Sequence, residues 1–242
     1  MKKDLKNKIK RDELVTGYER ARHSIDEHID ELKIAGVVIV VLAVGGFALR
    51  HFSSQRDHDA REALSLATQT YRAPVVGEQV TESAGTMFPT AEEKYKKALE
   101  EFEGVDRRYG SHPAAVRARY YAALCRIELG QPEEAEKVLK DIASQSGGGD
   151  RLEPALARLA LADLQRRTGQ IDRAADAYKQ IAGDPGFTLP RDHAQLSLAK
   201  MYEEAKRPAD AAQAYQDLIA NFPSSSYVSE ARRRVEYLQA RG

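Results

Sequence analysis

Three sets of residues recur along the chain at nearly constant intervals, and this recurrence limits the folds available to the chain more than any other feature. The first set consists of residues with small side chains, which lie 37, 39 and 37 positions apart: Ala98, Ala135, Ala174 and Ala211. The second lies four positions further on: Phe102, Leu139, Tyr178 and Tyr215. The third follows after three more positions: Val105, Ile142, Ile181 and Leu218. Steps of three and four place each unit's members on one helix face, so the pattern predicts a repeated helix.

Two further columns of alanines precede these sets, and a turn signal separates the two groups in each unit. The columns are Ala118, Ala157 and Ala194, then Ala123, Ala162 and Ala199. Gly130 and Gly169 lie where one helix must end and the chain turn back, and Lys206-Arg207-Pro208 occupies the third such position. Because one helical hairpin cannot bury its apolar face alone, we expect stacked hairpins. The alternative is an irregular bundle of Ala-rich helices.

The columns resemble the tetratricopeptide repeat, a helical hairpin of about 34 residues with small or apolar residues at fixed positions. The unit from Ala155 matches with Ala157, Leu161, Ala162, Gly169, Ala174, Tyr178 and Ile181. The unit from Val116 matches with Ala118, Ala122, Ala123, Gly130, Ala135, Leu139 and Ile142. The unit from Asp192 matches with Ala194, Leu198, Ala199, Ala211, Tyr215 and Leu218. The units are longer than usual, Lys206 replaces the expected glycine, and the fourth position, usually aromatic, holds Arg119, Arg158 and Gln195.

The ends of the repeat region also fit an array. Residues 57–71 read as a helix that would pair with a helix over 98–109, and a loop over 73–89, of unassigned role, separates them. The last helix, expected over 227–241, has the polar surface of an end cap. Its basic residues are Arg232, Arg233, Arg234 and Arg241. Solvation is the simple interpretation of these charges, and a basic docking patch is the alternative.

An uninterrupted apolar run, Ile34–Leu49, precedes the repeats. With Leu32 and Phe52 at its edges it covers 21 residues, or roughly 31 Å as a helix, which is enough to cross a membrane. A cleaved signal peptide is a second interpretation and a buried soluble helix a third. The 33 residues ahead of the run favour a retained anchor over 34–50.

The charges beside the run predict its orientation. Residues 1–33, an amphipathic tail, carry nine Lys or Arg, against three in the twenty residues after Leu49. This bias places the tail in the cytoplasm and residues 51–242 in the periplasm of a bacterium, with 34–50 in the inner membrane. The expected fold is therefore all-α: one transmembrane helix, then a tetratricopeptide-like α-solenoid of about four helical hairpins and a capping helix.

No catalytic chemistry is evident in the sequence. The 37 basic and 37 acidic side chains balance, which argues against nucleic acid as the main partner. Cys125 is the only cysteine, so no intrachain disulfide can form, and we interpret it as a packing residue. Asp57-His58-Asp59 points around a helix axis and cannot converge on one metal. We predict no enzyme activity, cofactor, metal or small-molecule substrate.

The resemblance implies that the first helix of each hairpin lines a groove for an extended peptide or a partner helix. The groove residues would be Arg117, Tyr120, Leu124, Ile127, Leu156, Leu159, Asp163, Arg166, His193, Leu196, Lys200 and Glu203. Apolar members would supply affinity and charged members selectivity.

The whole layout is similar to the ancillary subunits of the bacterial Sec translocon. That similarity implies a non-enzymatic scaffold that docks beside the translocon and contacts periplasmic chaperones. A cell-division or envelope-assembly adaptor is one alternative, because the segment Ala209–Gln216 and the residues after it also resemble repeats of such adaptors. A chaperone that holds unfolded clients is an alternative of a different class.

Overall fold

The computed structural model describes residues 29–77, 87–110, 112–145 and 152–240. Within these ranges every regular element is an α-helix, apart from one isolated β-bridge between Val75 and Phe88. The chain divides into two compact units, Met1–His58 and Asp59–Gly242. The first described helix, α2 (Ile29–Arg72), contains the boundary between them.

The described part of the first unit is the N-terminal part of α2, which includes the predicted 34–50 segment. Its described large apolar side chains have exposed fractions between 49% and 74%: Val38, Leu42, Val44, Phe47 and Phe52. Among the described residues, no helix combines the length and the apolar character needed to cross a membrane. Most of the predicted tail, residues 1–28, lies outside the described residues.

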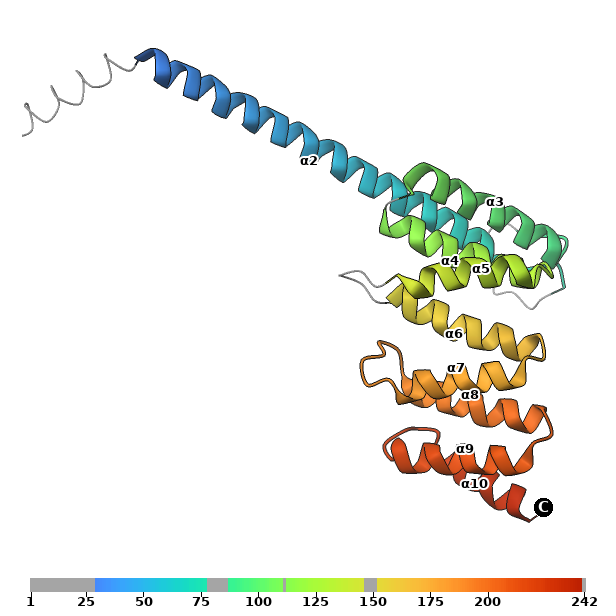
Figure 1. The fold of residues 1–242 in the computed structure, drawn as a ribbon. Helices are drawn as coiled ribbons and strands as arrows, with labels where there is room; N and C mark the ends of the chain where they lie inside the picture. Colours follow the sequence, from blue (N-terminus) through green and yellow to red (C-terminus); the bar gives the residue numbers. More distant parts are fainter. Residues whose placement is uncertain (1–28, 78–86, 111, 146–151, 241–242) are drawn as a thin grey trace, which may run out of the picture. The chain divides into compact units, whose positions relative to one another are not determined.

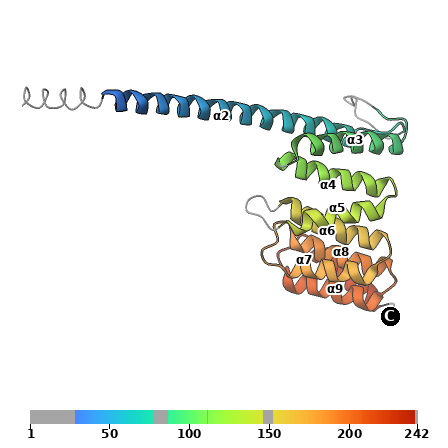
Figure 2. The same ribbon diagram turned by 45° about the horizontal axis from the view of Figure 1, so that its top comes forward.

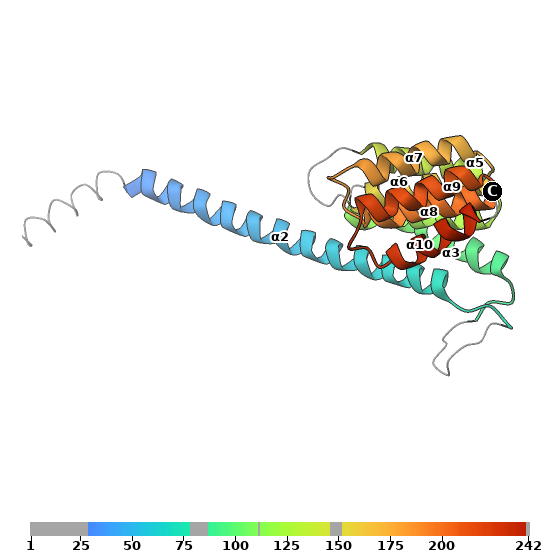
Figure 3. The same ribbon diagram turned by 90° about the horizontal axis from the view of Figure 1, so that it is seen from below.

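The second unit is a stack of antiparallel helices in chain order (Figures 1 and 2). They are α3 (Ala91–Tyr109), α4 (Pro113–Glu128), α5 (Pro132–Ser144), α6 (Leu152–Arg167), α7 (Ile171–Gly183), α8 (Arg191–Glu204), α9 (Pro208–Asn221) and α10 (Val228–Gln239). Figure 3 looks along the stack and shows α5 and α7 on one side of it, with α8 and α10 on the other. The end of α2 pairs with α3, and the pairs α4/α5, α6/α7 and α8/α9 follow before α10. The predicted array of hairpins with a final capping helix is therefore confirmed.

The residues of the repeat columns form the core. The four alanines of the first column are all 0% exposed, and the large residues four positions further on are at most 1% exposed. The third column, from Val105 to Leu218, is at most 4% exposed. Each small residue allows two helices to approach closely, and the large side chain one turn later fills the layer between them. Burial of these columns is the main favourable contribution to folding.

The turn inside each full hairpin has the same geometry. In all three, the residue at the predicted glycine position has a positive φ: 73° at Gly130, 75° at Gly169 and 56° at Lys206. The following residue donates its N–H to a carbonyl five residues back: Gln131 to Arg126, Gln170 to Gln165 and Arg207 to Tyr202, each at 2.8 Å. This is the Schellman ending of a helix, which satisfies its last carbonyl groups. The second helix then starts at once, in α5 and α9 with a proline whose φ already suits a helix.

The first hairpin carries the long loop predicted over 73–89. Its two ends are joined by the N–H of Val76 to the carbonyl of Phe88 at 2.9 Å, and the N–H of Phe88 to the carbonyl of Pro74 at 3.0 Å. Residues 78–86 lie outside the described residues. From Asp59 onward α2 packs against the stack, since Ala60 and Ala67 are fully buried. Tyr71 contacts the rings of Tyr95, Phe102 and Tyr121 at centroid distances of 5.8, 6.3 and 5.5 Å.

Candidate protein-binding face

The twelve residues predicted for the groove all lie on α4, α6 and α8, the first helices of successive hairpins. We call the surface that they form the A-helix face. Most of its members are half-buried: Arg117, Tyr120, Leu124, Ile127, Leu156, Leu159, Asp163, Arg166 and Glu203. His193 and Lys200 are exposed, and Leu196 is only 6% exposed. Leu196 therefore contributes to the core between α8 and its neighbours and has little surface to offer a partner.

The apolar part of the face is continuous with the core beneath it. Tyr120, Leu124 and Ile127 pack against the buried cluster that includes Leu139 and Ile142. Leu159 packs against the next cluster along the stack. Burial raises the pKa of Tyr120 to about 12, which keeps its phenol protonated at neutral pH. The core thus holds these side chains in place, while part of each side chain remains accessible to solvent.

Charged residues of the first helices, some of them on the A-helix face, pair across neighbouring hairpins. Arg117 of α4 donates through Nε to Glu153 Oε1 of α6 at 2.7 Å, and the Glu153 side chain is only 8% exposed. At the other end of the same helices, Arg167 binds Glu128 at 2.8 Å. Arg166 of α6 binds Glu204 of α8 at 2.7 Å. The first helices are therefore connected to one another by ion pairs as well as by packing.

A hydrogen bond from α7 holds Asp163 in the middle of the face. The hydroxyl of the buried Tyr178 donates to Asp163 Oδ1. Burial and this carboxylate both raise the pKa of Tyr178, so the tyrosine stays a donor. Asp163 is consequently oriented by the core and is half-buried on the A-helix face.

The last hairpin is tied to α10 in the same way. Lys200 approaches Glu230 at 3.1 Å, and Glu203 accepts from Arg234 Nε at 2.9 Å. The ring of His193 lies 6.5 Å from that of Tyr227 in an edge-on arrangement. Arg234, predicted as part of a solvated cap, thus binds α8, whereas Arg232 and Arg233 are exposed.

We did not predict from the sequence which residues form ion pairs with the charged residues of the first helices. The spacing of these residues in the sequence nevertheless indicates the pairs. Arg117 and Glu153 are 36 positions apart, Arg166 and Glu204 are 38 apart, and Glu128 and Arg167 are 39 apart. These separations are close to one repeat. Opposite charges one repeat apart on first helices fall on adjacent layers of the stack, where they can meet.

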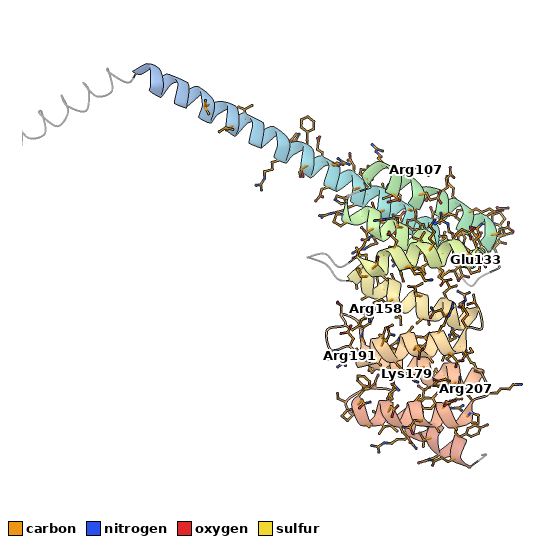
Figure 4. The ribbon with its side chains drawn as sticks, in the orientation of Figure 1. Arg107, Glu133, Arg158, Lys179, Arg191 and Arg207 are labelled. Atoms are coloured by element: carbon orange, nitrogen blue, oxygen red, sulfur yellow. The ribbon has the colours of Figure 1, made fainter. Side chains whose placement is uncertain are left out.

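Arg158 and Arg191 lie at the edge of the stack where α7 is connected to α8 (Figure 4). Arg158, at the unusual fourth position of its repeat, binds Asp184 at 3.0 Å and lies over the ring of Phe187. The bond lowers the pKa of Asp184. Arg191 donates to the carbonyl of Ala182 at 3.1 Å. These contacts secure the loop from α7 to α8, so the fourth-position arginine supports the hairpin connection rather than the A-helix face.

Two pockets lie beside these elements. One, of about 420 Å³, lies between the last turns of α2 and the first half of α4, next to the A-helix face. Its lining includes Arg61, Arg72 and Arg117. The other, of about 260 Å³, is bounded by α3, α4 and α5 and contains charges of both signs, with Arg126 paired to Glu103 at 2.5 Å.

The described residues contain no group of three or more His, Cys, Asp or Glu side chains placed to hold a metal ion. Cys125 is buried, and burial raises the pKa of its thiol to about 12. A thiol with so high a pKa is a poor nucleophile, so the packing role predicted for Cys125 agrees with its surroundings.

Comparison with known protein families identifies the family to which this stack of helical hairpins belongs. A model of the tetratricopeptide repeat-like domain matches residues 30–188, more than half of the chain. The chain belongs to the tetratricopeptide repeat-like domain family. A tetratricopeptide repeat model also matches residues 153–226. Repeats of this kind are typically non-enzymatic scaffolds that bind other proteins. No match was found among curated proteins.

Solved structures show the same fold. Two crystal structures of nearly identical TPR-like repeats, from a Podosopora anserina protein assigned as a kinesin light chain, are similar to this tetratricopeptide repeat-like protein. The first is 16% identical with a TM-score of 0.51, covering 76% of this chain and 94% of the other. The second is 15% identical with a TM-score of 0.50, covering 76% and 96%. At such identities the similarity concerns the fold alone.

Proposed function

We propose that this tetratricopeptide repeat-like protein is a non-enzymatic scaffold that binds a partner protein on the A-helix face. The observation that carries the proposal is the half-buried apolar surface of Tyr120, Leu124 and Leu156 next to charges fixed by Glu153 and Tyr178. A surface whose side chains are already ordered loses little conformational entropy on binding. Apolar anchors surrounded by oriented charges are the arrangement that a peptide or a partner helix requires.

The proposal includes a membrane anchor over 34–50, with 1–33 in the cytoplasm and 51–242 in the periplasm of a bacterium. The uncharged run Ile34–Leu49 and the charge bias around it support this placement. The exposed fractions of Leu42 and Phe47 are 68% and 74%, and large apolar side chains so exposed need a cover of lipid or protein. The family model also begins at residue 30, so one model takes in both the apolar run and the repeats.

The most specific form of the proposal is an ancillary subunit of the Sec translocon that contacts periplasmic chaperones. It is supported only by the similarity in layout. An envelope-assembly or cell-division adaptor is the second candidate, and a chaperone that holds unfolded clients is the third.

Site-specific photo-crosslinking in intact cells tests the scaffold. A photoreactive amino acid at Leu156, on the A-helix face, should give a discrete crosslinked partner. The same group at the exposed Lys179 of α7, labelled in Figure 4, is the matched control and should not capture that partner. Equal capture at both positions, or none at Leu156, would contradict a binding role for this face. Translocon subunits among the products support the first candidate, and envelope-machinery proteins alone support the second.

Alkaline carbonate extraction tests the anchor. The wild-type chain should remain with the membrane pellet, and Leu42→Arg, which puts a charge in the middle of the run, should weaken this retention. Recovery of the wild-type chain in the soluble fraction would exclude the anchor. The chaperone candidate predicts that the purified chain suppresses aggregation of an unfolded model client at near-stoichiometric amounts.

A further inference from the structure

The helix α10 occupies the position of a further first helix, and no second helix follows it within the described residues (Figure 1). Ala231 lies 37 positions after Ala194 and is 0% exposed, so the column of small residues on the first helices continues into α10. Four partly buried residues pack against the buried cluster that contains residues of α8 and α9: Tyr227, Val228, Val235 and Leu238. One face of α10 therefore continues the stack, and the opposite face lies at its end.

The opposite face of α10 differs from the same face of the preceding first helix. In α8, Ala199 is 0% exposed and Leu196 is 6% exposed, both within the cluster that includes α9. The residues 37 positions after them are Glu236 and Arg233, and both are exposed. A second helix packs closely where the first helix has an alanine, whereas a carboxylate at that place would be buried without a partner. A second helix cannot therefore close on α10 as α9 closes on α8.

The exposed residues of α10 form one stripe, which we call the α10 outer face. They follow at helical steps of three and four: Ser229, Arg232, Arg233, Glu236 and Tyr237. Its three charged members form no ion pair with any residue that the structure describes. The charges on the side of α10 towards α8 are paired, because Glu230 approaches Lys200 and Arg234 binds Glu203. The charges of the outer face are therefore left for another molecule.

Tyr237 gives this charged face an ordered aromatic side chain. Its residue is 43% exposed, and the guanidinium of Arg234 lies 4.9 Å from the centre of its ring. Arg234 is itself held, since its Nε donates to Glu203 of α8 at 2.9 Å. Among the described residues after Met87, Tyr237 is the only exposed large hydrophobic side chain. Exposed aromatic residues that are already ordered are typical of the centres of protein interfaces.

We propose that the α10 outer face pairs with the same face of a second copy of this chain, with the two helices antiparallel about a two-fold axis. Arg233 and Glu236 have opposite charges and are three positions apart. A two-fold axis midway between them places Arg233 of each copy opposite Glu236 of the other, so two ion pairs form at once. The same axis places Tyr237 opposite Arg232, where a cation–π contact can form. Antiparallel helices also oppose their dipoles favourably.

The charges of the face favour a second copy over a partner of one sign. An acidic partner would meet Glu236 and a basic partner would meet Arg232 and Arg233, whereas a second copy satisfies both signs. The area is small, because α10 has 12 residues and is roughly 18 Å long. A stable dimer needs about 800 Å² from each partner, which is more than one side of such a helix offers. The association is therefore weak and reversible, and it is separate from partner binding on the A-helix face.

Photo-crosslinking of the full chain in intact cells tests the pairing. A photoreactive phenylalanine analogue at Tyr237, which keeps an aromatic ring there, should give a product with twice the mass of the chain. The same analogue at the exposed Lys179 of α7 is the matched control and should give only the background of random collisions. An equal yield of dimer at the two positions would overturn the proposal.

Exchanging the charges tests the antiparallel register. Arg233→Glu and Glu236→Arg each place like charges opposite one another in both pairs, so each should lower the yield of dimer at Tyr237 by about tenfold. Two single variants expressed together, with the analogue on one and a tag on the other, should restore the wild-type yield as a mixed dimer, because each supplies the charge that the other lacks. Both substituted residues are exposed, and circular dichroism confirms that the helices are intact.

Unchanged dimer in the single variants, or no recovery in the mixture, would show that these charges do not form the pairs. A product at Tyr237 that contains another protein and no dimer would assign the face to that protein and would also overturn the proposal. The scaffold proposal is tested separately at Leu156. Capture of a partner there without any dimer at Tyr237 would leave the scaffold proposal standing alone, and a dimer without such capture would leave only the pairing through α10.

Discussion

Lys206 adopts a backbone conformation that residues with a Cβ atom rarely take. Its φ of 56° corresponds to 73° at Gly130 and 75° at Gly169 in the two preceding repeats. The left-handed conformation costs a residue other than glycine about 1–2 kcal/mol. The Schellman bonds on either side and the packing of α8 against α9 impose it nevertheless, so the turn is specified by the stack as much as by the residue in it.

Substitutions at these turns should change stability in opposite directions. Lys206→Gly should raise the free energy of unfolding by up to about 1 kcal/mol, because it relieves the strain. Gly169→Ala should lower it by about 1 kcal/mol. A Cβ at Gly169 would meet no atom within 4 Å, so the loss would report backbone strain alone. Urea denaturation of the full chain measures both, and two unchanged midpoints would show that the turns relax at no cost.

Among the elements, an ion pair that joins two helices differs in energy from an ion pair within one helix. Arg117–Glu153 joins α4 to α6 and buries the carboxylate to 8% exposure, whereas Lys96–Glu92 lies within α3 with both side chains more than 60% exposed. A buried carboxylate that loses its partner keeps its desolvation penalty, and an exposed one regains water. The first pair therefore fixes the relative position of two hairpins, and the second contributes little to stability.

Removing one member of each pair should separate the two kinds. Arg117→Ala should lower the free energy of unfolding by about 2 kcal/mol, because it leaves Glu153 buried without its cation. Lys96→Ala should lower it by no more than about 0.5 kcal/mol. Urea denaturation at low and high salt provides the measurement. Similar small losses in both variants would mean that water replaces Arg117 at Glu153.

At the scale of the whole molecule, protonated tyrosines are distributed through the stack. Burial raises the pKa of Tyr71, Tyr120 and Tyr215 to about 12. The pKa of Tyr178, which lies on α7 between the hairpins of Tyr120 and Tyr215, is raised as well. Each has its ordinary value of 10.0 in the unfolded chain. Folding is therefore linked to keeping these phenols neutral.

The chain should accordingly lose stability in alkali. A group whose pKa is raised on folding contributes its full stabilisation below its unfolded pKa, here 10.0, and loses it as the pH rises towards about 12. Helix content, followed by circular dichroism, should fall over this window together with the appearance of tyrosinate absorbance. Ionisation of all tyrosines near pH 10 with the helices intact would contradict this account.

The sequence by itself determined the period of the array, the residues of its core and the positions of its turns. Core columns such as Ala98 and Phe102 could be predicted because each satisfies a local helical spacing and also recurs at the next repeat. The turns at the glycines could also be predicted from the sequence, and the turn at Lys206 could be predicted from its position in the repeat alone. Such features depend on short-range geometry, which every unit repeats.

Only the tertiary structure decided which groups of the A-helix face are engaged and which remain for a partner. It buried Leu196, paired Arg117 with Glu153, tied Arg234 to Glu203 and grouped Arg61 and Arg72 into a pocket with α4. These outcomes depend on the offset between adjacent hairpins and on the reach of long side chains. A pattern along one helix carries neither quantity, because both are set by packing between residues about one repeat apart.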